Sequence, residues 1–309
     1  MLLRNATDTD IPAIIALLKR SLGESSSPKS ISYWNWKHNK NPFGKSPVLV
    51  ADSNNLLVGV RAMMQWQWQK GDKLFNTLRA VDTASHPDFQ GKGIFSKLTK
   101  QILEESKNKS FDFIFNTPNT QSKPGYLKMG WNVAGKLRIG LQLRFPSLLK
   151  KANSNYITYY DANLNNLCIH WNNEMSKSNK FFTTKSPNYL NWRYSNNPVI
   201  DYIIHCEHDI YIAAYMRPRK YFMELRISEL IYQGDAKTIA DKIKQVLNSL
   251  LSTTKLTLIS FSPDASDLIP GISFVLPIGP VFTLRNLNMQ VPFENLKDWN
   301  ISLGDLELF

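Results

Sequence analysis

Hydrophobic positions in the first 145 residues follow two periods, one typical of helices and one typical of strands. Residues that recur every three or four positions predict a first helix after the N-cap candidates at 7–10: Ile11, Ile14, Ile15, Leu18 and Leu22. Short apolar runs bounded by turn residues predict strands, at 3–5, 47–51, 56–64, 75–83 and 111–115. Further helices are expected at 31–38, 94–106 and 124–129, and closing strands are expected within 131–143.

The second half of the chain repeats part of this order. The motif Tyr33-x-Asn35-Trp36-Lys37-x-x-x-Asn41-Pro42 recurs as Tyr189-x-Asn191-Trp192-Arg193-x-x-x-Asn197-Pro198. Each copy precedes two strand-like runs, and the second half continues with a strand at 223–230, a helix at 237–251 and a strand at 256–260. The preserved order predicts a tandem duplication. Chance similarity in a chain rich in Asn and aromatic residues is the alternative.

A glycine-rich loop joins the strand at 75–83 to the helix that follows it. The loop reads Gln90-Gly91-Lys92-Gly93-Ile94-Phe95, and its two glycines let backbone amides approach a ligand without Cβ atoms in the way. Amides at a helix N-terminus lack intrahelical partners and attract anions, so the loop predicts a phosphate site. The corresponding joint in the second half, Gln233-Gly234-Asp235, has one glycine and a carboxylate, so we expect no phosphate site there.

The charge distribution narrows the choice of ligand only slightly. Of the 37 Lys and Arg residues, 22 lie in residues 1–150 together with 10 of the 25 Asp and Glu residues, so this half carries the whole net charge of +12. The excess suits a polyanionic ligand, although solvated lysines alone would also produce it. No zinc finger, basic helix or aromatic-basic motif points to specific nucleic-acid binding.

Length and the remaining composition set the class of protein. The two cysteines, Cys168 and Cys206, provide no disulfide framework and no metal-ligand cluster, so we expect no metal cofactor. No stretch reaches the ~20 apolar residues of a membrane span, and the N-terminus has no signal-peptide layout, so we expect a cytoplasmic protein. A chain of 309 residues suits about two domains, which we place at 1–146 and 147–309. The sequence does not indicate an oligomeric state.

Two motifs in residues 1–145 are specific enough to compare with a known family. The glycine-rich loop matches a Gln/Arg-x-x-Gly-x-Gly/Ala pattern, except that Phe95 stands at the final Gly/Ala position. The segment Asn119-x-x-Ser122-x-x-x-Tyr126-x-x-x-Gly130-Trp131 matches an Asn-x-x-Ala/Ser-x-x-x-Tyr-x-x-x-Gly-aromatic pattern. Together they resemble the GNAT superfamily of acyl-CoA-dependent N-acyltransferases. The resemblance implies an α+β or α/β fold with a mixed, mostly antiparallel central sheet flanked by helices, present twice in tandem, with no intact pyrophosphate loop in the second copy.

The resemblance also implies acetyl-CoA as co-substrate and assigns roles to individual residues. Backbone groups of Thr83, Ala84 and Ser85 would pair with the pantetheine arm, and the pyrophosphate would be held by Gln90, Gly91, Lys92, Gly93, Ile94 and Phe95. Asn119 would hydrogen-bond the pantetheine, or else cap a turn, and Tyr126 would be the general acid, or else a core residue. Asp82 is the candidate general base. The alternatives are an ion pair of Asp82 with Arg79 or a neighbouring lysine, and a reaction without a dedicated base.

The expected function is an acetyl-CoA-dependent N-acetyltransferase that acts on the primary amine of a small molecule. Amino sugars and their nucleotide conjugates are candidate acceptors, because aromatic residues at 34, 66 and 68 would suit a sugar ring in a pocket completed by the second copy. One alternative is a Fem-like aminoacyl transferase that uses charged tRNA, although a tRNA donor does not require the pyrophosphate loop. The other alternative is a non-enzymatic acyl-CoA-binding protein.

Overall fold

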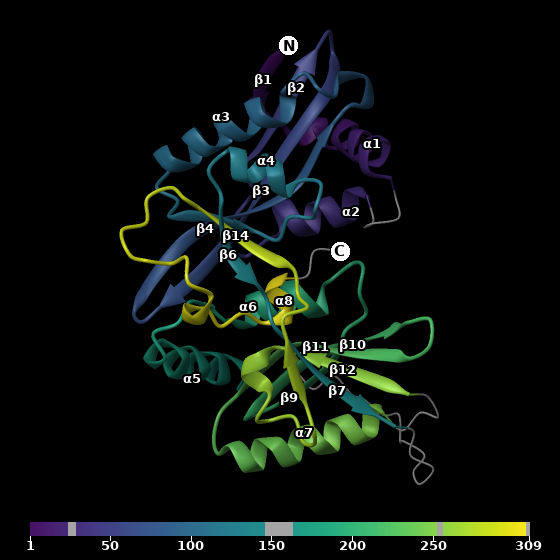
Figure 1. Cartoon of the computed structure of the whole chain (residues 1–309), viewed down its shortest axis with the longest axis vertical. Coiled ribbons are helices and arrows are strands. Elements are labelled where there is room, and N and C mark those ends of the chain that lie inside the picture. The colour runs from purple at the N-terminus through teal and green to yellow at the C-terminus, as the bar shows by residue number, and fades with distance from the viewer. Residues whose placement is uncertain (24–28, 146–162, 252–255, 307–309) are drawn as a thin grey trace. The chain divides into compact units, whose positions relative to one another are not determined.

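The computed structural model describes residues 1–23, 29–145, 163–251 and 256–306, which divide into two compact units (Figure 1). The first unit comprises Met1–Gly135 and Pro280–Leu296, and the second comprises Lys136–Gly279 and the C-terminal segment that starts at Lys297. Each unit contains one mixed, mostly antiparallel sheet flanked by helices. The predicted fold class is therefore confirmed.

The sheet of the first unit has the strand order β1-β2-β3-β4-β5-β14-β6. Its strands are Leu2–Asn5 (β1), Val48–Ser53 (β2), Leu56–Lys70 (β3), Lys73–Ser85 (β4), Phe113–Asn116 (β5), Asn132–Lys136 (β6) and Val281–Asn286 (β14). The strands β1 to β4 pair antiparallel with their neighbours, whereas β4 and β5 pair parallel. The predicted strands at the start of the chain are thus confirmed, and β3 and β4 form a longer hairpin than the apolar runs indicated.

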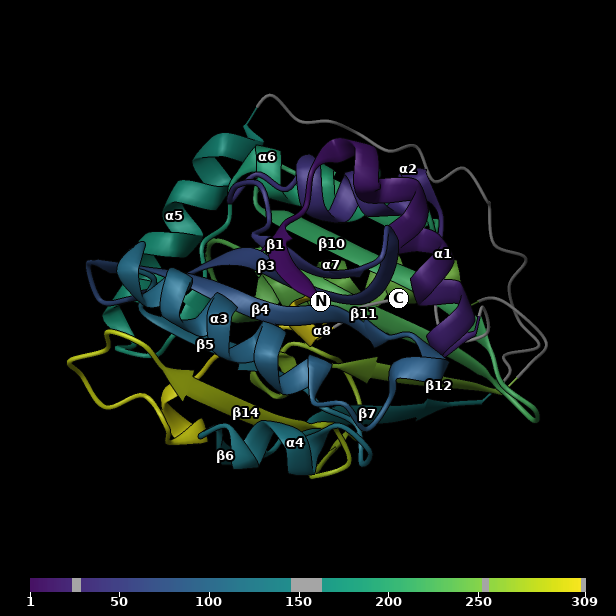
Figure 2. The same cartoon turned by 90° about the horizontal axis from the view of Figure 1, so that it is seen from above.

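Helices cover both faces of this sheet. Figure 2 shows α1 (Ile11–Leu22) and α2 (Ile31–Trp34) on one face, with α3 (Ile94–Asn108) and α4 (Lys123–Lys128) on the other. The predicted apolar stripe of α1 is buried except at Leu22, and Ile94, Leu98 and Ile102 bury one face of α3. Burying a large aliphatic side chain contributes about 1.5–3 kcal/mol, so these stripes fix both helices on the sheet. The helix expected at 31–38 is present, but its second half, Asn35–Asn39, is a π-helical turn.

The second unit is built on a sheet with the order β13-β7-β12-β11-β10-β9. Its strands are Ile139–Arg144 (β7), Ile203–Glu207 (β9), Ile210–Pro218 (β10), Met223–Tyr232 (β11), Thr257–Phe261 (β12) and Phe274–Leu276 (β13). Its helices are Leu164–Lys177 (α5), Pro187–Leu190 (α6), Ala236–Leu250 (α7) and Leu303–Leu306 (α8). A π-helical turn, Asn191–Ser195, again follows the short helix of the repeated motif.

The two units repeat one order of elements, as a tandem duplication predicts. In each, a short helix and a π-helical turn precede three antiparallel strands, a helix and a strand that pairs parallel with the third. Each hairpin also carries a bulge at the same place. Asp82 is the extra residue between Thr83 and Val81 on β4, and Ser228 is the extra residue between Glu229 and Ile227 on β11. The register therefore aligns Asp82 with Ser228 and Thr83 with Glu229.

The last strands of the two copies lie in exchanged sheets. Strand β7, from the expected closing strands at 131–143, pairs with β12 of the second unit, and β14 from the end of the chain pairs with β5 of the first. The boundary expected at 146/147 falls on residues outside those described. Residues 280–296, which we expected in the second domain, belong to the first unit. The amphipathic pattern of a strand specifies its buried face but does not identify the neighbouring strand.

Candidate active site

A cleft opens in the first unit where β4 and β5 separate. The two parallel strands pair only at Leu78 with Ile114 and at Arg79 with Phe115, and β4 then bulges at Asp82, where φ is +20°. The cleft has a volume of about 540 Å³, and its lining includes five residues that the sequence singled out: Asp82, Thr83, Phe95, Asn119 and Tyr126. Because β5 does not pair with the end of β4, that edge is open to hydrogen bonds from a ligand.

The glycine-rich loop lies at the N-terminus of α3. Gly91 and Gly93 have φ of +75° and +73°, a left-handed conformation that residues with a Cβ adopt at a cost of about 1–2 kcal/mol. No side chain caps α3, because its N-cap is Gly93. Apart from the adjoining residues of the loop, no heavy atom of the described residues lies within 4 Å of where a Cβ would stand on either glycine. The first-turn amides therefore face open space, which fits a bound pyrophosphate. The Lys92 ammonium lies 4.3 Å from the Phe89 ring centroid, an arrangement that holds its charge beside the loop.

Tyr126 and Asn119 reach the cleft from the segment around α4. The Tyr126 side chain is buried, and its hydroxyl oxygen accepts a hydrogen bond from Arg61 Nη1 at 2.9 Å. Asn119 Oδ1 accepts hydrogen bonds from the backbone amide of Ser122 at 2.8 Å and from its hydroxyl at 2.9 Å. Asn119 thus caps the turn before α4, the alternative named for it, while its amide nitrogen can still donate to a ligand in the cleft.

Asp82 is held by two residues of the π-helical turn. Its Oδ2 accepts from Lys37 Nζ at 2.7 Å and from His38 Nε2 at 2.8 Å, and His38 Nδ1 lies 2.9 Å from Ser46 Oγ. Burial alone would raise the pKa of Asp82, but Lys37 and His38 together hold this pKa well below its ordinary value. Burial lowers the pKa of His38. At neutral pH Asp82 is therefore a carboxylate of low basicity, better suited to attract an ammonium group than to remove a proton.

The ion pair named as the alternative for Asp82 thus exists, and its partner is a lysine, Lys37, rather than Arg79. Lys37 lies 45 residues away, in the motif that the two halves share. Arg61, the partner of Tyr126, was also missed. A single cation in the apolar run Leu57-Val58-Gly59-Val60-Arg61-Ala62-Met63-Met64 was the signal that could have identified it, because buried charges in strands need a partner.

The aromatic residues expected to bind an acceptor belong instead to the core. Trp66 and Trp68 are 2% and 0% exposed, and Trp68 packs its ring edge-on against Phe115 at 5.3 Å. Trp34 is also buried. These rings cannot stack on a sugar, so the specific support for an amino sugar acceptor is lost.

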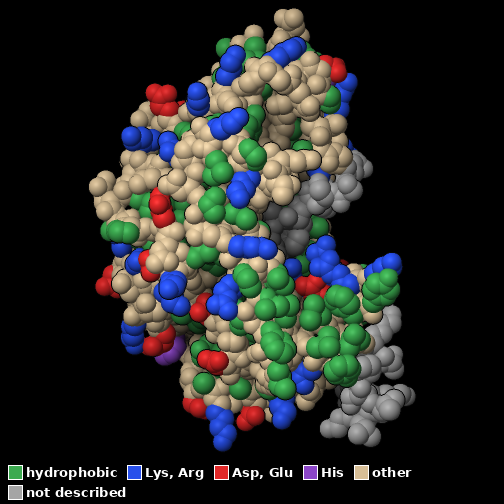
Figure 3. Space-filling model, viewed as in Figure 1, with side chains coloured by type: hydrophobic (Ala, Val, Ile, Leu, Met, Phe, Trp, Pro, Cys, Tyr) green, Lys and Arg blue, Asp and Glu red, His purple; other side chains and the backbone are tan. Residues whose placement is uncertain are grey.

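On the face shown in Figure 3, Lys and Arg side chains are scattered over the surface rather than gathered in one patch.

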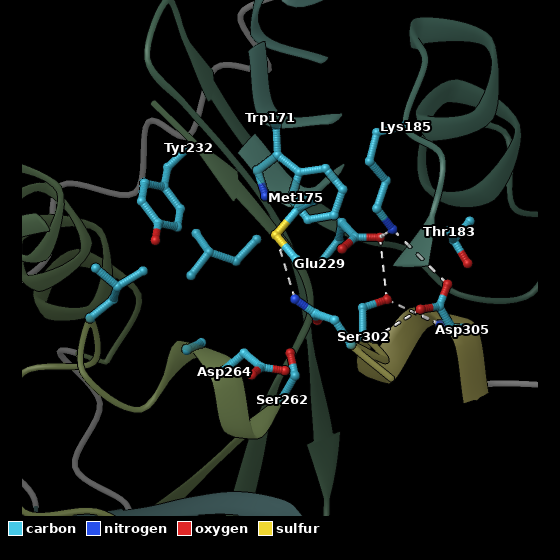
Figure 4. A pocket seen from close by; sticks show the side chains of 14 residues that line it. Trp171, Met175, Thr183, Lys185, Glu229, Tyr232, Ser262, Asp264, Ser302 and Asp305 are labelled. Carbon is cyan, nitrogen blue, oxygen red and sulfur yellow. Dashed lines mark hydrogen bonds and ion pairs between the residues drawn. The ribbon is translucent and has the colours of Figure 1, made fainter. Parts of the chain in front are cut away.

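The second unit has a smaller cavity at the matching place, beside the ends of β11 and β12. It measures about 100 Å³ and is drawn in Figure 4. Glu229, which aligns with Thr83, accepts from Lys185 at 2.5 Å and from the Tyr194 hydroxyl at 2.9 Å. At the N-terminus of α7, Asp235 accepts hydrogen bonds from the amides of Lys237 and Thr238. A carboxylate thus occupies the position that a phosphate would need, and this copy does not fit a pyrophosphate.

Two further properties concern metals and membranes. Among the described residues, no group of three or more His, Cys, Asp or Glu side chains could hold a metal ion. Within the same ranges, no helix combines the length and apolar character needed to span a bilayer.

Comparisons with known proteins agree with this geometry. Residues 3–134 match the model of the acetyltransferase (GNAT) domain family. Among solved structures, the chain is similar to a GCN5-related N-acetyltransferase from Anabaena variabilis, with 14% identity, a TM-score of 0.66 and coverage of 93% of this chain and 73% of that one. A probable N-acyltransferase from Enterococcus faecalis is similar with 12% identity, a TM-score of 0.66 and coverage of 94% and 73%.

A GCN5-related N-acetyltransferase from Kribbella flavida gives 14% identity, a TM-score of 0.62 and coverage of 93% of this chain and 71% of that one. A search of curated protein sequences found no significant match. At these identities the structural similarity establishes the fold, and the family model and the motifs identify the catalytic class. Residues 3–134 therefore match the acetyltransferase (GNAT) domain family, the family that the two motifs resemble.

Proposed function

We propose that the first unit binds acetyl-CoA and transfers the acetyl group to the primary amine of a small molecule. The observation that carries this proposal is the combination of an uncapped, doubly glycine-flanked N-terminus on α3 with a cleft that contains the Tyr126 side chain. One feature can hold a pyrophosphate and the other can protonate a leaving group. Both lie in the domain that matches the acetyltransferase family.

The residues of the first unit fit the co-substrate in two places. The amides of Gly91, Lys92 and Gly93 would donate to the pyrophosphate, and the open edge of β4 from Thr83 to Ser85 would pair with the amide groups of the pantetheine arm. When bound, acetyl-CoA supplies an activated thioester. The chain then has to orient the acceptor amine, exclude water and deliver a proton to the leaving sulfur.

Tyr126 is the group we assign to that proton transfer. Its hydroxyl carries a proton that it can donate, and it lies in the cleft that Thr83 also lines. Asp82 faces the same cleft with 20% of its side chain exposed. Since Lys37 and His38 keep it ionised, its role would be to attract and orient the ammonium form of the acceptor. The amine would lose its proton to water rather than to a dedicated side chain.

Binding of the co-substrate is tested at the glycines of the loop. Gly93→Ala should raise the Kd for CoA roughly 5- to 30-fold, because the left-handed conformation costs an L-residue about 1–2 kcal/mol. Gly71→Ala is the matched control: Gly71 has φ of +56°, equally open surroundings and a position in the β3–β4 turn. Equal Kd values for the two variants in calorimetry would contradict the assignment of the loop.

Turnover is tested by thiol release and mass spectrometry of products from acetyl-CoA and a panel of amino sugars, polyamines and peptides. We expect one amine class to be acetylated and Tyr126→Phe to lower kcat while the KM for acetyl-CoA stays within about twofold. If charged tRNA supported transfer and acetyl-CoA did not, the Fem-like alternative would replace this proposal.

A further inference from the structure

Arg61 is a buried cation with unused hydrogen-bonding capacity. It lies in the middle of β3, and its side chain is 0% exposed. Nη1 donates to the Tyr126 hydroxyl, whereas Nε and Nη2 have no hydrogen-bond partner among the described residues. Arginine stays protonated in proteins, so this is a buried positive charge, and no carboxylate of the described ranges pairs with it.

Such an arrangement is poor for stability. A buried polar group without a partner costs free energy, and a buried charge costs more, so an apolar side chain of similar size would suit this position better. Exceptions of this kind in a folded protein call for a specific explanation, and function is a frequent one. Within the described part of the chain, the guanidinium donates to one acceptor, the Tyr126 hydroxyl that we assign as the acid, and this contact links the arginine to catalysis.

The direction of this hydrogen bond decides where the phenolic proton points. A guanidinium has only donors, so Tyr126 must accept with its oxygen, and its own hydrogen is left for another acceptor. Among the described residues, no hydrogen bond uses that hydrogen. Arg61 also lies over the Tyr126 ring, with Cζ 5.2 Å from the centroid. The cation is therefore adjacent to the oxygen on which negative charge forms when the proton leaves.

Phe95 completes the cluster and explains the departure from the family's loop pattern. Its ring meets the Tyr126 ring edge-on at 5.6 Å, and Arg61 Cζ lies 5.6 Å from the Phe95 centroid. A Cβ on Gly125 would stand 3.1 Å from Cε1 of Phe95, so the glycine makes room for this ring. In the second unit, the residue that aligns with Arg61 by register is Ala213, so the copy without a phosphate loop also lacks the cation.

We propose that Arg61 is a positioning residue that aims the Tyr126 hydroxyl at the leaving sulfur and stabilises the phenolate that remains, an inference that rests on the acid role proposed for Tyr126. The acceptor nitrogen bonds to the thioester carbon, the carbon–sulfur bond breaks, and sulfur keeps the electron pair and takes the phenolic proton. The amine proton goes to water, and the phenolate is reprotonated from water, so the products are the amide and the free thiol.

The test changes the leaving atom of the acetyl donor and keeps the rest of the donor, and so its contacts with the protein, the same. Acetyl-CoA is compared with the acetyl selenoester of seleno-CoA, whose selenolate leaves without a proton. Arg61→Met should lower kcat with acetyl-CoA about 10- to 100-fold, less than the roughly 10²- to 10⁴-fold that a whole general acid contributes, because Tyr126 is still present. It should change kcat with the selenoester less than about threefold. Arg61→Lys, which keeps a cation, should recover most of the loss. The Met variant should be at least as thermally stable as the wild type, because the unpaired charge is gone.

Three comparisons separate the possible failures. Tyr126→Phe should reproduce the leaving-group dependence, and the double variant should be no slower than Tyr126→Phe alone. Arg79→Met, a buried arginine that lies over Phe115 rather than Tyr126, should affect both donors equally. Equal losses with both donors for Arg61→Met would overturn the proposal. Full activity of Tyr126→Phe would instead remove the acid assignment itself, whereas a slow Tyr126→Phe with a fully active Arg61→Met would remove only the role of Arg61.

Discussion

Replacing Asp82 by Asn should destabilise the first unit strongly, although it removes only one charge. Lys37 and His38 both donate to the same oxygen, Oδ2, and the Lys37 side chain is 4% exposed. Without the carboxylate, the ammonium stays buried with no negative charge to balance it among its described contacts, and its Nζ lies 4.7 Å from the centroid of the Tyr33 ring. Removing one partner of a buried ion pair typically costs about 3–5 kcal/mol, and we expect a loss in that range. Asn tolerates the positive φ of Asp82, so the bulge itself should persist.

The assay is urea unfolding followed by tryptophan fluorescence, with a double-mutant cycle. Lys37→Met should cost less than Asp82→Asn, because Asp82 is 20% exposed and retains His38, and the double variant should recover more than about 1 kcal/mol of coupling. Asp88→Asn is the control, since Asp88 is 70% exposed and its pair with Arg20 at 3.8 Å is a surface contact of little energetic value. A loss below about 1 kcal/mol for Asp82→Asn would refute the argument that the pair is buried and unscreened.

Three further expectations follow from single contacts. The pKa of Asp82 is lowered in the folded state, so its contribution to stability is complete above the ordinary carboxyl pKa of about 4 and is lost as the pH falls further. The difference in unfolding free energy between wild type and Asp82→Asn, measured by urea titration, should therefore narrow below about pH 4. Asp235→Ala should lower the Tm, because two amides of α7 lose their acceptor, while CoA binding at the first unit stays unchanged in calorimetry. Gly140→Ala should lower the free energy of unfolding by about 1–3 kcal/mol, since its Cβ would overlap Cε2 of Phe261, and an unchanged midpoint in urea would show that this ring can move aside.

Local patterns predicted the elements well because each was specified by residues close in sequence. The stripe from Ile11 to Leu18 and the two glycines beside α3 are examples, and both lie where the sequence placed them. The same holds for the repeat, since the Tyr-x-Asn-Trp motif forms a short helix and a π-helical turn in both halves. These features depend on backbone preferences and on one buried face, which a sequence displays directly.

The contacts of the site that the sequence did not predict join residues far apart in the chain. Asp82 and Lys37 are 45 residues apart, and Arg61 and Tyr126 are 65 apart. Nothing in the local sequence distinguishes a lysine that points into the unit from one in solvent. The prediction that Trp66 and Trp68 bind an acceptor was wrong for a related reason. Their alternation with glutamines shows that both rings share a face of the strand, but it does not show that this face is buried.

The exchanged strands make a prediction about the smallest functional fragment. Strand β14 pairs with β5 over four residues, and the Thr283 hydroxyl donates a hydrogen bond to Asn116 Oδ1. The ring of Phe282 is buried, and its centroid lies 6.0 Å from that of Phe115. A chain that ends at residue 145 lacks these contacts, so β5 becomes an unpaired apolar edge beside the proposed cleft. We expect this fragment to aggregate and to bind no CoA.

A fragment in which residues 280–296 follow residue 135 through a flexible linker of about ten Gly and Ser residues should recover CoA binding. Carrying Phe282→Ala, the same fragment should lose about 3–5 kcal/mol of its stability, because a buried aromatic ring is removed from the β5 side of the sheet. Calorimetry with CoA and urea unfolding measure both effects. If residues 1–145 alone unfolded cooperatively and bound CoA as the full chain does, then β14 would be dispensable, and the acyl-CoA site would depend only on residues that precede it in the chain.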